Sequence, residues 1–223
     1  MIVALAGRRI DKEGARPPRF PLANLEFVRQ RLHDLLQEEA VTALVSSAAC
    51  GADLLALSEA DAIGIRCRVV LPFDRVRFRE TSVLDRPGDW RFYDSIIDKV
   101  TANNDLITLA ASSDEQRAYE AANRAILDEA QALGRATREE VRVVLVWDGR
   151  SRGPGDLTEA FGVAAKQKGL TKCPRSDHVE DVLCRARLWR ENRSVNRPKT
   201  QPGCFLRSDQ GGRGRSGAQM RAS

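Results

Sequence analysis

Residues 141–169 read "VRVVLVWDGRSRGPGDLTEAFGVAAKQKG", and this stretch decides the fold. It opens on a nearly unbroken apolar run at 141–148, which predicts a strand buried on both faces. A turn rich in Gly and Pro follows at 153–155, and after it the apolar residues recur at helical spacing. A buried strand that leads through a short turn into an amphipathic helix is the repeating unit of parallel α/β sheets.

The same unit recurs throughout residues 1–170. Apolar runs predict strands at 2–6, 42–47, 66–72, 105–110 and 141–148. Periodic stretches between and after them predict helices at 22–40, 52–64, 90–100, 113–134 and 156–169. Ser113 is the expected cap of the fourth helix, and Gly64 and Gly134 are the expected ends of the second and fourth. The alternation predicts a Rossmann-like, three-layer α/β/α domain at 1–170, with a parallel sheet of about five strands.

Residues 171–223 break this pattern. They become rich in Arg, Gly, Ser and Pro, a composition that buries too little apolar surface to offset the entropy of ordering. We therefore expect an irregular basic tail that is mostly disordered. Twelve basic and five acidic residues lie in it, so the net charge of +5 leaves residues 1–170 slightly acidic. Nucleic acid is not an expected partner, because the predicted domain has no basic stripe.

The apolar runs, cysteines and motifs of the full sequence exclude several classes of protein. None of the apolar runs in the 223 residues is long enough to span a membrane, and the first residues lack the basic and long apolar parts of a signal peptide. The five cysteines include no C-x-x-C pair, so no metal site is expected. Neither G-x-G-x-x-G nor a P-loop is present, and no cofactor is expected. We expect a cytoplasmic protein without a membrane partner. A homodimer is left open.

Ligands of open parallel sheets bind beyond the carboxyl ends of the strands, so the residues that follow the strands form the candidate site. They are Gly7, Arg8 and Arg9 after the first strand, Ala49, Cys50, Gly51 and Asp53 after the second, Pro72, Phe73, Phe78 and Ser82 after the third, and Gly153, Pro154, Gly155, Asp156 and Thr158 after the fifth.

Each of these groups has a binding interpretation and a structural one. Arg8 and Arg9 can hold phosphate or carboxylate, or can lie solvated in a loop. Asp53 opens a helix, where it suits the helix dipole and can accept a hydrogen bond from a ligand hydroxyl. The phenylalanines can stack on a base or belong to the core. The turn 153–156 can cradle a phosphate at a helix N-terminus, or can be a plain turn that leads into a helix capped by Asp156 or Thr158.

Four stretches together resemble the SLOG superfamily of Rossmann-like domains, named after the SMF/DprA and LOG proteins: "IVALAGRRID", "SSAACGADLLALSEA", "VVLPFDRVRFRETSV" and "VWDGRSRGPGDLTEAF". The resemblance covers residues 1–170 and is strongest to the bacterial modules that stand alone or beside signalling domains. It implies a nucleotide or nucleotide-derived ligand at the carboxyl edge of the sheet.

LOG enzymes release bases from nucleoside monophosphates and carry a loop P-G-G-x-G-T-x-x-E that ends in a catalytic glutamate. Here Asp156 replaces the second glycine, and Phe161 stands at the glutamate position. The leading hypothesis is therefore binding or sensing of a nucleotide-derived molecule. The alternatives are a LOG-like N-glycosidase, with Glu80, Glu159 or Asp53 as the candidate carboxylate, and a DprA-like nucleic-acid-binding protein.

Overall fold

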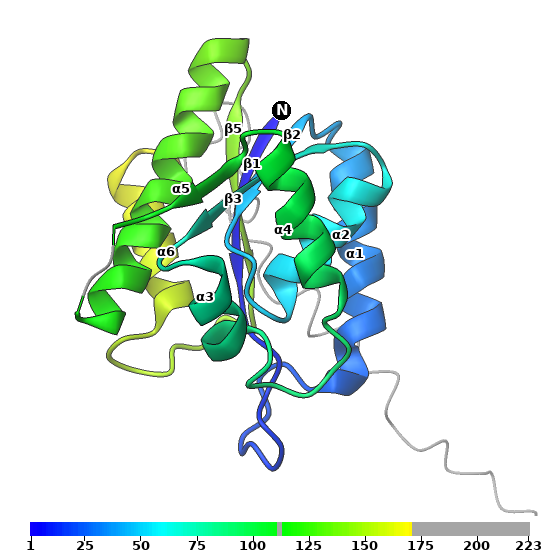
Figure 1. The fold of residues 1–223 in the computed structure, drawn as a ribbon, viewed down its shortest axis with the longest axis vertical. Helices are drawn as coiled ribbons and strands as arrows, with labels where there is room; N and C mark the ends of the chain where they lie inside the picture. Colours follow the sequence, from blue (N-terminus) through cyan, green and yellow to red (C-terminus); the bar gives the residue numbers. More distant parts are fainter. Residues whose placement is uncertain (111–112, 171–223) are drawn as a thin grey trace, which may run out of the picture.

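The computed structural model describes residues 1–110 and 113–170, which form a five-stranded parallel sheet between two layers of helices (Figure 1). The predicted fold class is confirmed. The strands are β1 (Ile2–Gly7), β2 (Ala43–Ser46), β3 (Arg66–Leu71), β4 (Leu106–Thr108) and β5 (Val141–Val146). The helices are η1 (Leu22–Asn24), α1 (Leu25–Glu38), α2 (Ala52–Ala62), α3 (Arg75–Ser82), α4 (Phe92–Ala102), α5 (Glu115–Thr137) and α6 (Leu157–Gln167). The predicted tail, 171–223, lies outside the described residues.

The strand order is β4-β3-β2-β1-β5, and every neighbouring pair is parallel. In register, Ile2 of β1 lies opposite Ala43 of β2 on one side and Val141 of β5 on the other. The long helix α5 carries the chain back across the sheet from β4 at one edge to β5 at the other. After β1 the chain turns to one face of the sheet, and after β5 it turns to the opposite face, so a crevice opens between these strand ends.

Both faces of the sheet are buried, which is why the strands are almost continuously apolar. Val3 and Leu5 of β1 pack in one core with α1, α2 and α4. Ile2 and Ala4 point the other way and pack in a second core with α5 and α6. Figure 1 shows these two helical layers on either side of the strands.

The predicted ends of the fourth helix are wrong. Asp114, not Ser113, caps α5 by accepting a hydrogen bond from the Arg117 amide at 3.1 Å. The helix continues through Gly134 to Thr137. A Cβ on Gly134 would lie 2.5 Å from Cγ2 of Val141, so glycine at this position permits close packing against the start of β5 instead of ending the helix.

The helix α3 was not predicted from the sequence pattern. Asp74 caps this short helix, accepting hydrogen bonds from the amides of Val76 and Arg77. Only Phe78 and Ser82 of its residues are buried, so its eight residues contain too few apolar positions to show a helical period. The helix matters for the site, because it lies beyond the carboxyl end of β3.

Candidate functional site

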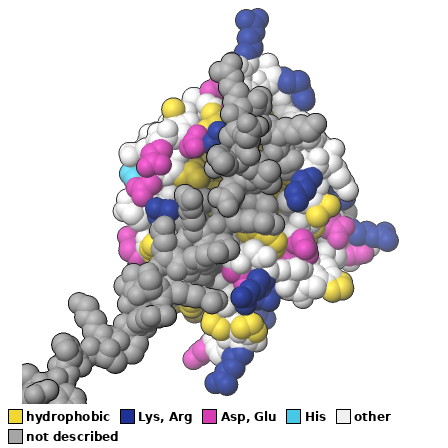
Figure 2. All heavy atoms as spheres, turned by 180° about the vertical axis from the view of Figure 1, so that it is seen from behind, with side chains coloured by type: hydrophobic (Ala, Val, Ile, Leu, Met, Phe, Trp, Pro, Cys, Tyr) yellow, Lys and Arg dark blue, Asp and Glu magenta, His cyan; other side chains and the backbone are white. Residues whose placement is uncertain are grey.

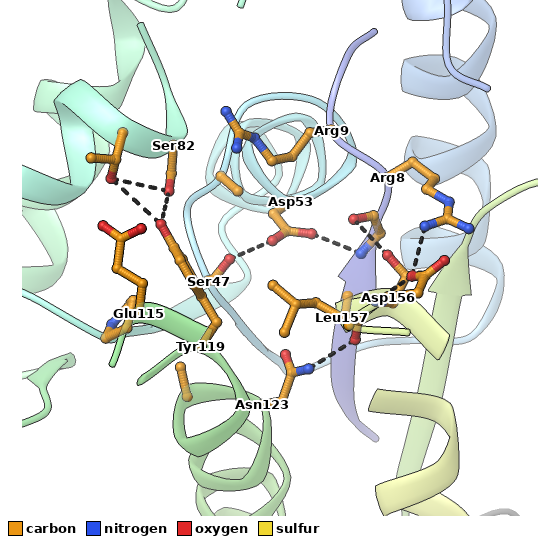
Figure 3. A pocket seen from close by; sticks show the side chains of 18 of the residues that line it. Arg8, Arg9, Ser47, Asp53, Ser82, Glu115, Tyr119, Asn123, Asp156 and Leu157 are labelled. Atoms are coloured by element: carbon orange, nitrogen blue, oxygen red, sulfur yellow. Dashed lines mark hydrogen bonds and ion pairs between the residues drawn. The ribbon is translucent and has the colours of Figure 1, made fainter. Parts of the chain in front are cut away.

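A cavity of about 480 Å³ opens at the carboxyl edge of the sheet, a volume typical of a small-molecule site. Its walls are the ends of β1 and β2, the start of α2, the inner faces of α3 and α5, and the turn before α6 (Figure 3). The strand-end residues that line it are Gly7, Arg8, Arg9, Ala49, Asp53, Pro72, Phe78, Ser82, Pro154, Gly155, Asp156 and Thr158. The loops proposed from the sequence therefore meet in one place.

Several proposed residues do not line the cavity. Cys50 is buried in the core, and burial raises the pKa of its thiol. Phe73 is also buried and packs edge-to-face on Tyr119, with ring centroids 5.4 Å apart. Gly51 has a supporting role: its φ is 105°, and a Cβ there would lie 2.6 Å from the carbonyl oxygen of Arg8. This glycine lets the loop after β1 pass close to the start of α2.

The two glutamates proposed as catalytic candidates lie outside the cavity wall, as does Gly153. Glu80 is on the exposed side of α3. Glu159, in the first turn of α6, accepts a hydrogen bond from the hydroxyl of Ser151. Of the three carboxylates weighed from the sequence, Asp53 is the one that lines the cavity.

The cavity wall also contains residues that the sequence did not indicate. They are Ala6, Ser47, Thr81, Arg86, Glu115, Tyr119, Ala122, Asn123, Ile126, Arg152 and Leu157. Tyr119, Asn123 and Ile126 are spaced along one face of α5 at helical intervals. That spacing was visible in the sequence, but only the crossover from β4 to β5 shows that this face points into the site.

Asp53 lies inside the cavity with its carboxylate held on both sides. One oxygen accepts a hydrogen bond from the Gly7 amide at 2.9 Å, and the other accepts one from the Ser47 hydroxyl. Burial raises the pKa of Asp53 to about 7, outweighing these hydrogen bonds and the nearby charge of Arg9. Near neutral pH this group can therefore act as donor or acceptor toward a ligand.

Both carboxylate oxygens of Asp156, by contrast, already have partners within the protein. One oxygen accepts from the amides of Thr158 and Glu159, which makes it the cap of α6, and the same oxygen pairs with Arg8 at 2.7 Å. The other oxygen accepts from the Arg152 amide at 2.7 Å. Burial opposes ionisation, but these hydrogen bonds and the Arg8 charge together lower the pKa of Asp156.

This capping decides between the two interpretations of the turn 153–156. A phosphate at the first turn of α6 would have to displace the Asp156 carboxylate from the amides of Thr158 and Glu159. The geometry therefore favours a capped turn over a phosphate cradle at this position.

Arginines gather on another part of the wall. The carboxylate of Asp85 pairs with Arg9 through one oxygen and with Arg86 through the other, the latter at 3.2 Å. Asp85 itself does not line the cavity. Burial lowers the pKa of Arg152, and the charge of Arg8 lowers it further, while the charge of Asp156 opposes this shift. Within residues 1–110 and 113–170, the Arg152 guanidinium makes no hydrogen bond or ion pair.

The part of the wall formed by α3 and α5 is more apolar. Phe78 of α3 and Ala122 and Ile126 of α5 line it, with Glu115 at the start of α5. The hydroxyls of Ser82 and Tyr119 lie 2.8 Å apart, and Figure 3 shows both on the side of the cavity away from Arg8. These hydroxyls line the cavity together with apolar side chains, an arrangement suited to an aromatic heterocycle.

A scan against protein-family models finds no match for this chain, and a search of curated proteins finds none either. The assignment of function therefore depends on the chemistry of the cavity. In the described part of the chain, no group of three or more His, Cys, Asp and Glu side chains is arranged to hold a metal ion. Every helix described is too short or too polar to cross a bilayer.

The charge pattern of the surface bears on the expectation that nucleic acid is not a partner. Figure 2 shows the molecule from behind, and where the described residues are visible there, basic and acidic side chains are interspersed. That part of the face carries no continuous basic stripe of the kind that follows a phosphate backbone.

Proposed function

We propose that residues 1–170 bind a nucleotide or a nucleotide-derived small molecule in the cavity at the carboxyl edge of the sheet. The observation that carries this proposal is that one cavity, at the switch point of a parallel sheet, combines apolar side chains of α3 and α5 with four arginines, Arg8, Arg9, Arg86 and Arg152.

The base, the ribose and the anionic part of such a ligand can each be matched to residues of the cavity. An aromatic base fits against Phe78 and Ile126, where the hydroxyls of Ser82 and Tyr119 offer hydrogen bonds to its edge. A ribose hydroxyl suits Asp53, because its carboxyl group accepts or donates near neutral pH. The anionic part is drawn to the arginines.

The resemblance to the SLOG superfamily supports the same ligand class. It depends on "AGRRID", "AACGAD" and the turn before α6, and all three stretches contribute residues to the cavity wall. The two departures from the LOG loop, Asp156 and Phe161, favour binding over base release. Asp156 caps α6, and the side chain of Phe161, a residue of α6, is fully buried in the core.

The test is a thermal-shift screen of the full chain against nucleoside monophosphates, cyclic nucleotides, nucleosides and ADP-ribose. A ligand that binds only the folded chain raises Tm, and the stabilisation grows with the logarithm of its concentration once this exceeds Kd. We expect at least one member of this panel to do so. A folded chain that none of them stabilises would rule the proposal out.

A matched pair of variants places the binding in the cavity. Tyr119→Phe removes a hydroxyl from the cavity wall, whereas Tyr93→Phe removes a buried hydroxyl that donates to the Arg75 carbonyl outside it. Loss of one neutral hydrogen bond weakens binding by roughly three- to tenfold. We expect this loss for Tyr119→Phe and unchanged affinity for Tyr93→Phe.

A second candidate function is hydrolysis of the N-glycosidic bond, favoured by one observation. Asp53 is a carboxyl group inside the cavity whose pKa of about 7 suits general acid or base catalysis. Free base released from a nucleoside monophosphate, and lost in Asp53→Asn, would favour this function. Tight binding without any base release would favour the first.

A further inference from the structure

We propose that the anionic group of the ligand binds between Arg9, Arg86 and Arg152, and that the first turn of α6 takes no part in holding it. This inference rests on the proposed function and deepens it, because it assigns the phosphate end of the ligand to named side chains. It also sets this chain apart from proteins that hold phosphate at a glycine-rich helix start.

The first step is the state of the two helix N-termini at the cavity. The amides of Thr158 and Glu159 at α6 already donate to Asp156. At α2, the Ala52 amide donates to the carbonyl of Arg8 and the Leu54 amide donates to that of Ala49. Two first-turn amides of each helix already have acceptors within the protein, which favours side chains as the partners of an anion.

The second step is the repulsion that remains among the arginines. Arg9 and Arg86 share one carboxylate, that of Asp85, which stands behind them and outside the cavity. Arg152 has no ion pair within the described residues, and the charges of Arg8, Arg86, Asp156 and Asp11 all reach it. Asp85 is the one carboxylate ion-paired with these three guanidinium groups in the described residues, so the group keeps positive charge that a bound anion would relieve.

The third step is the contrast with Arg8. Arg8 is only 2% exposed, pairs with Asp156, donates to the carbonyl of Arg150 and lies over the ring of Trp147 at 5.2 Å. Its charge is already neutralised and its position fixed. Among the cavity arginines, Arg9, Arg86 and Arg152 are therefore the ones with capacity for a ligand.

Asp85 orients two of these three arginines. Because its two oxygens hold Arg9 and Arg86 from outside, both guanidinium groups are oriented before a ligand arrives. Arg152 comes from a different element, the loop before α6, so an anion bound by all three would join that loop to the segment after α3. A group with several acceptor oxygens, such as a phosphate, suits such a three-sided site.

The experiment measures, by calorimetry on the full chain, the affinity for AMP, GMP, CMP and UMP and for the four matching nucleosides. Each pair differs only in the phosphate. The variants are Arg152→Gln and Arg86→Gln, with Arg150→Gln as the control, since Arg150 lies in the same loop as Arg152 and does not line the cavity. Arg152→Lys keeps the positive charge and tests for partial rescue.

We take the nucleoside monophosphate that binds wild type. We expect Arg152→Gln and Arg86→Gln each to lower the affinity for it by about tenfold or more, as loss of a charge-assisted hydrogen bond does. The matching nucleoside should keep its affinity, Arg150→Gln should change neither, and Arg152→Lys should recover part of the loss. Fold is verified by each variant's Tm without ligand.

Two contrary outcomes are distinguishable. Suppose that wild type binds a nucleotide, but that the arginine variants lower the affinity for nucleotide and nucleoside equally, or lower neither affinity. The inference is then overturned and the proposed function stands. If wild type binds none of these nucleotides and nucleosides, the inference fails, and the proposed function fails with it when cyclic nucleotides and ADP-ribose also give no thermal shift.

Discussion

Replacing Asp53 with asparagine removes an ionisable group from the cavity, and the consequence for stability depends on pH. Burial raises the pKa of Asp53 from 3.8 to about 7. The folded chain therefore holds a proton that the unfolded chain has already released between these two pH values. Because the folded state binds more protons there, the contribution of Asp53 to stability is complete below pH 3.8 and is lost as pH rises toward 7.

The size of the effect follows from the shift. Roughly three pKa units at about 1.4 kcal/mol each give a loss of up to about 4 kcal/mol in the free energy of unfolding across this window. An asparagine side chain cannot ionise, so the Asp53→Asn variant lacks this loss. Its amide oxygen can still accept from the Gly7 amide, and any cost of the new amide group is the same at every pH.

Urea unfolding of both proteins from pH 4 to pH 8 provides the assay. The difference in unfolding free energy, variant minus wild type, should rise with pH and level off above pH 7. Ser47→Ala serves as a second probe: it removes a hydrogen bond that lowers the pKa of Asp53, so its midpoint should move upward. A difference curve that stays flat, or falls with pH, would refute the reasoning.

Two further pairs of variants test the structural roles of Gly51 and Asp156 by comparing the loss of stability within each pair. Gly51→Ala should destabilise the fold by about 3 kcal/mol or more, because its Cβ would meet the Arg8 carbonyl at 2.6 Å, whereas Gly64→Ala, also at positive φ but in open space, should cost about 1 kcal/mol in thermal or urea unfolding. Equal costs would contradict the close approach at Gly51. Asp156→Ala should cost about 3–5 kcal/mol because it removes the cap of α6 and leaves buried Arg8 without its shorter ion pair, whereas Asp74→Ala, which removes a solvent-exposed cap, should cost about 1 kcal/mol. Similar losses for the two aspartates would show that the Arg8 pair adds little.

The sheet and the place of the site could be predicted from the sequence because both depend on short-range patterns. Continuous apolar runs mark strands buried on two faces, and parallel strands all end at one edge. Residues directly after those strands, such as Gly7, Asp53 and Gly155, therefore had to lie near one another. All three line the cavity.

What escaped prediction depends on contacts between distant parts of the chain. Arg8 and Arg9 are adjacent in sequence, yet Arg8 is buried against Asp156, 148 residues away, while Arg9 pairs with Asp85 beside the cavity. No local pattern separates these two roles. Tyr119 lies on a regular helix face, but its place in the cavity depends on which side of the sheet α5 crosses. The capping role of Asp156 was one of two interpretations, and only the geometry favours it.

The central claim, that a nucleotide-derived ligand binds at the carboxyl edge, is tested most directly by mapping amide chemical shifts on the isotope-labelled full chain during titration with the ligand that gives the largest thermal shift. A second cavity, of about 220 Å³ beside the start of β3 and lined by Gly64, Cys67 and Lys99, provides an internal control. We predict that saturable shifts will occur at Gly7, Asn123 and their neighbours and will be absent around the second cavity. Shifts centred on the second cavity, or none that saturate at the carboxyl edge, would contradict the account.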